Sequence, residues 1–220
     1  MKEIWLIRHA ESTANAGAAT SQPATIPLTE RGIEQARCVA ASFTKQPDLV
    51  VLSPYLRAQQ TAAPLLDRFP NTISQEWDVQ EFTYLAADRC HNTTLTERKP
   101  MVAEYWSRSE PGYCDGPGAE SFSQFVARTR AMLEKTRGLL EAPTDPANFI
   151  AVFTHGQLIQ LTMWLLWHKV AELNGQSMSA FHCFLLAITV PNTAIVRLRY
   201  EDLPFFSGAI TSHLPPNLIT

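Results

Sequence analysis

The sequence predicts an α/β fold in which a mainly parallel sheet is covered by helices on both faces. Short apolar runs alternate with helical patterns along the chain, which is typical of that arrangement. Hydrophobic residues make up 45% of the 220 residues, enough for a large core, and there is no internal repeat. We therefore expect residues 1–220 to form one domain with a single insertion.

The predicted strands are apolar or β-prone runs of four or five residues: 4–7, 49–52, 73–77 and 149–153. Two later runs, residues 187–190 and 194–198, flank Pro191-Asn192-Thr193. They predict a closing hairpin or two adjacent strands.

Three helices have recognisable starts. Thr29 is placed as an N-cap with Glu30 in the first turn, and the inward positions at helical spacing are Ile33, Ala36, Ala40 and Phe43. Ser53 as N-cap and Pro54 at the first helical position predict a helix that continues to about residue 69. Residues 121–124 form a capping box, and that helix should end before Pro143.

Residues 82–119 interrupt this alternation and are polar, with a Pro/Gly-rich end. Such an insertion after a strand predicts a lid over a site at the sheet edge. Its basic residues either contact a second anionic group of a substrate or form a solvated surface: Arg89, Arg98, Lys99 and Arg108. Residues 201–220 are expected to pack irregularly on the surface.

Charge and composition exclude several classes of function. A net charge of −3 and a pI near 6.1 argue against binding to nucleic acid or acidic membranes. The chain shows no secretory signal, and its apolar stretches at 158–167 and 181–190 are too short to span a bilayer. The four cysteines are scattered without metal-type spacing, so we expect neither zinc nor disulfides. We expect a cytoplasmic protein, and its oligomeric state stays open.

Charged and imidazole side chains follow the predicted strands at one edge of the sheet. Arg8 and His9 end the first strand, Arg57 follows the second, and His155 with Gly156 ends the fourth. Arginines and histidines at strand ends suit a phosphoryl group, because guanidinium forks match tetrahedral oxyanions. Helix N-termini after Ser53 and Thr154 would add N–H dipoles.

This set of residues predicts a covalent mechanism. A neutral imidazole at His9 can attack phosphorus and hold the phosphoryl group, while Arg8, Arg57 and His155 neutralise its charge. A carboxyl group with a raised pKa then protonates the leaving alkoxide. Glu81 is the candidate, with Glu76 and Asp78 as the alternatives if the register differs.

The chain also resembles the histidine phosphatase superfamily, in the branch that holds cofactor-dependent mutases. The resemblance covers roughly residues 3–200 and is carried by five ordered motifs: Arg8-His9-Ala10-Glu11-Ser12 with Asn15, Leu28-Thr29-Glu30-Arg31-Gly32 with Gln35-Ala36, Ser53-Pro54 with Arg57 and Thr61, Gly118-Ala119-Glu120-Ser121, and Thr154-His155-Gly156. Ala10 departs from the family, which usually has Gly there, and its methyl group is expected to crowd the backbone mildly.

What the resemblance implies is a three-layer α/β/α sandwich and a phosphohistidine at His9. It also implies phosphate contacts from Arg8, Arg57 and His155, an acid at Glu81, and Asn15 in the phosphate pocket. We expect a phosphatase without metal or cofactor that acts on a small phosphate ester, with a phosphoprotein substrate still open. The alternatives are a cofactor-dependent phosphoglycerate mutase and a non-catalytic phosphate-binding domain.

Overall fold

A computed structural model describes residues 2–168, 172–200 and 205–220, and it contains a sheet with the strand order β3-β2-β4-β1-β5-β6. The strands are β1 (Lys2–Arg8), β2 (Leu49–Leu52), β3 (Ile73–Glu76), β4 (Phe149–Thr154), β5 (Ile195–Tyr200) and β6 (Phe205–Phe206). β1 pairs with β4, β4 with β2 and β2 with β3, all in parallel, while β5 and β6 are antiparallel at one edge. The prediction of a mainly parallel sheet is confirmed.

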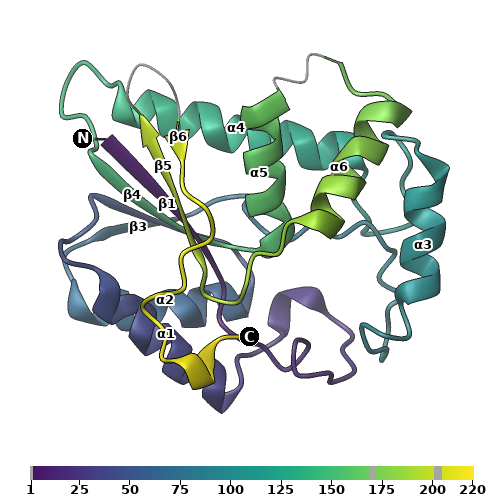
Figure 1. Cartoon of the computed structure of the whole chain (residues 1–220), viewed down its shortest axis with the longest axis horizontal. Helices are drawn as coiled ribbons and strands as arrows, with labels where there is room; N and C mark the ends of the chain where they lie inside the picture. The colour runs from purple at the N-terminus through teal and green to yellow at the C-terminus, as the bar shows by residue number, and fades with distance from the viewer. Residues whose placement is uncertain (1, 169–171, 201–204) are drawn as a thin grey trace.

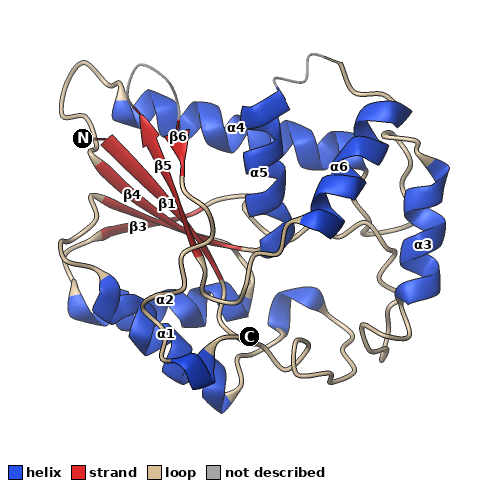
Figure 2. Ribbon diagram, in the orientation of Figure 1, coloured by secondary structure: helices blue, strands red, loops and turns tan. Residues whose placement is uncertain are grey.

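Helices cover both faces of this sheet (Figures 1 and 2). α1 (Glu30–Ser42) and α2 (Leu56–Arg68) lie on one face, and α4 (Phe122–Leu140) with α5 (Gly156–His168) on the other, where α6 (Gly175–Ala187) packs beside α5. Successive strand residues face opposite layers. Trp5 and Ile7 therefore pack with α1 and α2, whereas Ile4 and Leu6 pack with α4 and α5. The three-layer sandwich is confirmed.

Two of the three predicted helix starts are confirmed. The Thr29 side chain accepts a hydrogen bond from the Gly32 amide, and Ser121 with Gln124 forms a complete capping box before α4. Ile33 is a wrong prediction, because its side chain is 42% exposed. The buried stripe of α1 runs through Gly32, Gln35, Ala36, Val39 and Ala40 instead.

Two other predictions are wrong. α2 begins at Leu56, and Ser53 is not its N-cap, because the cap position is Tyr55 and no side chain caps the helix. Residues 187–190 are not a strand either, since α6 continues to Ala187 and the chain then passes to β5 without pairing. The long apolar pattern there belongs to a helix packed on α5, which short apolar runs cannot distinguish from a strand.

The insertion carries α3 (Lys99–Arg108) at the far right of Figure 1, where it packs against α6 and Trp106 stacks on His182. The part of the insertion that precedes α3 is joined to the segment after β1 by an antiparallel bridge between Thr20 and Thr93. A short 3-10 helix (Pro23–Thr25) lies in that same segment.

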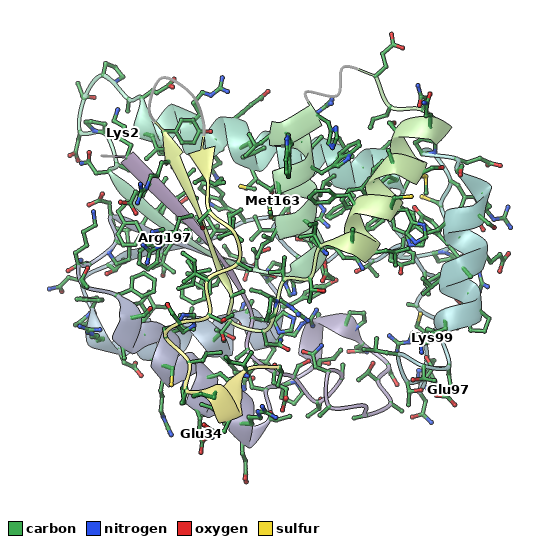
Figure 3. All side chains as sticks on the ribbon, in the orientation of Figure 1. Lys2, Glu34, Glu97, Lys99, Met163 and Arg197 are labelled. Carbon is green, nitrogen blue, oxygen red and sulfur yellow. The ribbon has the colours of Figure 1, made fainter. Side chains whose placement is uncertain are left out.

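Figure 3 shows side chains on both sides of these layers: Glu34 points outward from α1, and Met163 lies inside. Near the C-terminus, Ile210 bridges Ile195, and a 3-10 helix (Pro216–Leu218) follows. The expected irregular packing is confirmed for most of the described residues after 206 and is wrong for β6, which joins the sheet; residues 201–204 lie outside the described residues. In the part of the chain that is described, every helix is too short or too polar to cross a membrane.

Candidate active site

The register of the parallel strands brings the predicted site segments together. Arg8 of β1 is paired with Thr154 of β4, and Leu52 of β2 with Phe153. The next residues continue this pairing, since the His9 amide donates to the Thr154 carbonyl at 2.9 Å and the Ser53 amide to the Phe153 carbonyl at 3.0 Å. The carboxyl ends of three strands therefore meet at one edge, as in other open α/β sheets.

His9 is buried, and each of its ring nitrogens has a separate partner. Nδ1 lies 2.7 Å from the Ala10 carbonyl, which can only accept, so the proton is on Nδ1. Nε2 keeps its lone pair and accepts from Arg57 Nε at 3.1 Å. Burial lowers the pKa of His9 well below its usual range, and the charges of Arg57 and Arg8 lower it further. The ring is therefore a neutral imidazole whose unprotonated nitrogen is Nε2.

His155 is fully buried beside His9, with 5.1 Å between the ring centroids. Its Nε2 lies 2.8 Å from Ser53 Oγ, whereas its buried Nδ1 has no partner in the described part of the chain. Burial and the charge of Arg57 lower its pKa as well. The His155 ring itself does not line the cavity described below.

Arg8 and Arg57 bring positive charge to the same place. Arg8 Nη1 donates to the Val190 carbonyl at 2.6 Å, and its buried Nε has no partner among the described residues. Arg57 Nη1 donates to the Pro23 carbonyl at 2.7 Å, and burial lowers the pKa of Arg57 to about 10, so it stays charged at neutral pH. A Cβ at Gly156 would lie 3.4 Å from Arg8 Nε, so this glycine leaves room for the guanidinium.

Glu81 lies opposite His9 at the start of α5. Its Oε1 accepts from the amides of Phe82 at 3.1 Å and Gln157 at 3.2 Å. Burial nonetheless raises the pKa of Glu81, against the opposing influence of Arg57. A carboxyl group of raised pKa beside a nucleophile has the properties of a proton donor.

Asn15 lines the same cavity, and its Oδ1 accepts from Ser12 Oγ at 3.0 Å and from Asn192 Nδ2 at 3.2 Å. Asn192 also donates to the His9 carbonyl at 3.0 Å. Ala10 is buried against Leu28 and Ala36, and its backbone is not in the positive-φ region, so its methyl group fits a small apolar cluster.

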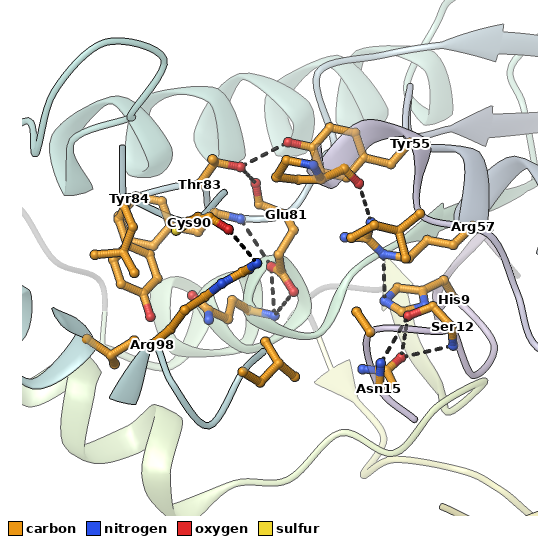
Figure 4. Close-up of a pocket in the computed structure, with 18 of the residues that line it drawn as sticks. His9, Ser12, Asn15, Tyr55, Arg57, Glu81, Thr83, Tyr84, Cys90 and Arg98 are labelled. Atoms are coloured by element: carbon orange, nitrogen blue, oxygen red, sulfur yellow. Dashed lines mark hydrogen bonds between the residues drawn. The ribbon is translucent and has the colours of Figure 1, made fainter. Parts of the chain in front are cut away.

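A cavity of about 310 Å³ opens at these residues (Figure 4). Of the predicted site residues, Arg8, His9, Asn15, Arg57 and Glu81 line it, while His155 and Gly156 lie next to it. The alternatives Glu76 and Asp78 are exposed and do not line it. In residues 2–168, 172–200 and 205–220, no three His, Cys, Asp or Glu side chains are grouped to hold a metal ion.

Sequence reasoning missed three residues with a part in this site. Ser53 hydrogen-bonds His155, Gln157 gives its amide to Glu81, and Asn192 ties the His9 carbonyl to Asn15. The position of Gln157, two residues after His155 in the first turn of a helix, was a usable signal. Asn192 lies 183 positions from His9, and no local pattern connects the two.

Comparison with known proteins agrees with this geometry. The sequence profile described as histidine phosphatase superfamily (branch 1) matches residues 4–205. The chain belongs to this superfamily. The superfamily's phosphohistidine chemistry involves a nucleophilic histidine, which makes the strand-end cluster around His9 its candidate active site.

The relatives of this chain carry names of both phosphatases and mutases. It is 30% identical over 173 residues to an adenosylcobalamin/alpha-ribazole phosphatase of Salmonella typhimurium, which covers 77% of this chain and 82% of the relative. It is 28% identical over 212 residues to the protein named "Probable phosphoglycerate mutase GpmB" of Yersinia pestis, covering 94% and 89%.

Solved structures share the fold. A phosphoserine phosphatase from Entamoeba histolytica superposes with a TM-score of 0.72 at 20% identity, covering 98% of this chain and 100% of that one. The alpha-ribazole phosphatase from Shigella flexneri gives a TM-score of 0.70 at 21% identity, covering 94% and 95%. The predictions of the family and of the fold are confirmed.

Proposed function

We propose that this protein hydrolyses small phosphate monoesters through a phosphohistidine formed on His9 Nε2. The observation that carries the proposal is the fixed state of His9, whose proton is held on Nδ1 by the Ala10 carbonyl while Nε2 faces Arg57 at the cavity. A cavity of about 310 Å³ is at the small end of the range for ligand pockets and supports a small-molecule substrate.

In the first step, the Nε2 lone pair attacks phosphorus and the bond from phosphorus to the ester oxygen breaks. Protonated Glu81 gives its proton to the departing alkoxide, so the alcohol leaves neutral. The phosphoryl oxygens receive hydrogen bonds from Arg8 and Arg57, and the unpartnered Arg8 Nε and His155 Nδ1 are available to the same group.

In the second step, a water molecule attacks the phosphohistidine. The Glu81 carboxylate takes a proton from this water, the phosphorus–nitrogen bond breaks, and the electron pair returns to Nε2. Inorganic phosphate leaves, and both His9 and Glu81 are restored. The chemistry draws only on side chains of this chain, so we expect turnover without a metal or a cofactor.

The test is hydrolysis of p-nitrophenyl phosphate by the purified protein in the presence of EDTA. His9→Ala should lose at least about a thousandfold in kcat/KM, as removal of a catalytic nucleophile does. Acid-labile, base-stable phosphate should be trapped on the wild type and not on the variant. His91→Ala is the matched control, because His91 is exposed and outside the cavity.

Four results would overturn parts of this proposal. Full activity in His9→Ala rejects the nucleophile, and loss of wild-type activity in EDTA rejects metal independence. Conversion of 3- to 2-phosphoglycerate stimulated by 2,3-bisphosphoglycerate, faster than hydrolysis, assigns the site to a mutase, which the Yersinia relative's name makes the second candidate. Phosphate binding without any turnover assigns it to a binding domain.

A further inference from the structure

The cavity has two ends of different chemistry (Figure 4). His9 and Arg57 lie on one side, Arg98 and Tyr84 lie on the other, and Glu81 lies between them. The walls away from His9 are largely apolar and include Ile26, Leu85, Leu95 and Val102. A substrate whose phosphate lies at His9 therefore extends along apolar side chains toward Arg98.

Among the four basic residues of the insertion, Arg98 differs from the others in its contacts and in its position at the cavity. Arg89 forms ion pairs with Asp115 and Glu104, and Arg108 pairs with Glu104. Lys99 is exposed at the outer edge of the molecule (Figure 3). Of these four residues, Arg98 alone lines the cavity.

The guanidinium group of Arg98 is positioned by hydrogen bonds to uncharged oxygen atoms. Nε donates to Thr93 Oγ1 at 2.8 Å, and Nη2 donates to the carbonyls of Thr20 at 2.9 Å and Cys90 at 3.1 Å. Within the described part of the chain, no carboxylate lies within 4.0 Å of the guanidinium, and Nη1 has no hydrogen-bond partner. One N–H-bearing nitrogen without a partner among the described residues thus remains at the far end of the cavity, and the nearby Glu97, whose pKa is lowered by hydrogen bonds and further by the charge of Arg98, forms no ion pair with it.

The other charged residues around the cavity do not alter this balance. Besides Arg98 they are Arg8 and Arg57, at the end that the proposed mechanism assigns to the phosphoryl group, and Glu81, which lies between the two ends. Among the described residues no acidic side chain lines the far end, so an ammonium group there would find no counter-charge. An anionic group would find Arg98, and a charge-assisted hydrogen bond to a carboxylate is among the stronger polar contacts in proteins.

We propose that the substrate is a small phosphate monoester whose alcohol part is an apolar carbon skeleton ending in a carboxylate, which accepts a hydrogen bond from Arg98 Nη1. This inference rests on the proposed function, because it takes the phosphate to lie at His9. A single free nitrogen suits a singly charged carboxylate, and the apolar side chains of Leu85, Leu95 and Val102 in the cavity wall suit a largely apolar carbon skeleton.

The experiment compares three aryl esters: phenyl phosphate, 4-carboxyphenyl phosphate and 4-(aminomethyl)phenyl phosphate. At low salt, the wild type should prefer the carboxylated ester over phenyl phosphate by about tenfold in kcat/KM, and the aminomethyl ester should be the poorest. Arg98→Met should remove this preference while keeping activity on phenyl phosphate, and Arg98→Lys should restore part of it. Lys99→Met is the matched control, since it removes a neighbouring charge that does not line the cavity.

Phenyl phosphate separates recognition from damage to the fold, because loss of the hydrogen bonds to Thr20 and Cys90 would slow all three esters equally. An equal loss on every ester in Arg98→Met, or a wild type that does not prefer the carboxylated ester, overturns the inference and leaves the phosphatase intact. A wild type that cleaves none of the esters, p-nitrophenyl phosphate included, overturns the proposed function itself.

Discussion

At His9 the backbone determines which ring nitrogen reacts. The Ala10 carbonyl holds the Nδ1 proton, and Arg57 meets Nε2. The charges of Arg57 and Arg8 act with burial to keep the ring neutral, as a nucleophile requires. Burial acts on Glu81 in the opposite chemical sense, because it raises that pKa and keeps the proton that the leaving group needs.

Replacing Glu81 should affect poor leaving groups most. Glu81→Gln cannot donate a proton, so we expect kcat/KM for phenyl phosphate to fall about a hundredfold or more and that for 2,4-dinitrophenyl phosphate to change little. In the wild type, activity should decrease as the pH rises through the raised pKa of Glu81, because the acid is then ionised. The variant should lack that alkaline limb. Steady-state rates from about pH 4 to about pH 9 measure both effects, because this range begins near the ordinary Glu pKa of about 4.3 and extends well above it.

Glu76→Gln is the matched control for this prediction. Glu76 is the carboxylate that a shift of the predicted register would have placed in the site, but it is exposed and bonded to Gln59 Nε2 at 3.1 Å. Its substitution should leave the dependence on the leaving group unchanged. Equal slowing of both esters in Glu81→Gln would show that Glu81 positions the substrate and does not donate the proton.

Ser53 shows the limit of residue-level reasoning. Its place before Pro54 suits an N-cap, but its hydroxyl contacts His155 Nε2 and accepts from the Tyr55 amide, while α2 begins further along the chain. A tertiary hydrogen bond to a buried imidazole outweighs a local preference worth about 1 kcal/mol. No pattern around residue 53 contains that competing partner.

Among the elements, α1 is placed against the segment that follows β1. The Thr29 amide, at the N-cap of α1, donates to the Glu11 carbonyl at 3.0 Å. A Cβ at Gly32 would lie 2.1 Å from that same carbonyl oxygen. The glycine is therefore required for the close approach of the helix to the chain that carries His9.

Gly32→Ala should destabilise the protein by about 1 to 3 kcal/mol, because the helix or the segment at Glu11 must move to admit the methyl group. Urea unfolding followed by circular dichroism measures the change. Gly138→Ala in α4 is the control, since a Cβ there would meet no atom of the described chain within 4 Å. That variant should gain about 0.5 to 1 kcal/mol from helix propensity. Equal effects of the two substitutions would contradict the packing argument.

Two helix starts, those of α1 and α4, followed from local chemistry, whereas the start of α6 was missed although Asn174 and Ser177 form a complete capping box. Thr29 and the capping box at Ser121 were predicted because their partners lie three residues away. Which side of a helix faces the core was harder to predict. The hydrophobicity of Ile33 favoured burial, but the close approach of Gly32 to Glu11 turns a different side of α1 toward the sheet, and Ile33 is exposed. Residues 181–187 are helical because they continue α6, which starts at the Asn174 cap and packs against α5.

For the molecule as a whole, the buried site should make stability depend on pH. Burial lowers the pKa of both His9 and His155 well below the value of about 6.5 that they have in an unfolded chain. Below that pH the unfolded chain binds protons that the folded protein does not, so the free energy of unfolding should decrease as the pH falls through about 6.5. The same contribution is fully present above it.

The measurement is the free energy of unfolding from pH 5 to 8, spanning the histidine value of about 6.5, in a Glu81→Gln background. That background matters because the raised pKa of Glu81 gives a contribution of the opposite sign, which is lost as the pH rises. Replacing His9 and His155 by Gln should flatten the decrease at acidic pH. His91→Gln should not, since that ring is exposed. An unchanged slope in the double variant would contradict the burial of neutral imidazoles.

The four basic residues of the insertion also differ only once the whole molecule is folded. Along the chain they lie between residues 89 and 108, and nothing in the sequence distinguishes one from another. In the structure Arg89 and Arg108 meet carboxylates, Lys99 meets solvent, and Arg98 reaches the cavity across the bridge between Thr20 and Thr93. Whether the insertion moves as a lid stays a prediction.

The mainly parallel sheet, the strand-end positions of Arg8, His9 and His155, and membership of the superfamily followed from the amino-acid sequence alone. They depend on periodicity, on caps closed within one turn, and on motifs in a set order, all of which are local along the chain. Only the tertiary structure decided which nitrogen of His9 is unprotonated, why Ser53 bonds to His155 and does not cap α2, and which basic residue of the insertion lines the cavity. Those outcomes depend on burial and on distant partners, such as Ser53 with His155 and Arg98 with Thr20, whose separations in the chain are 102 and 78.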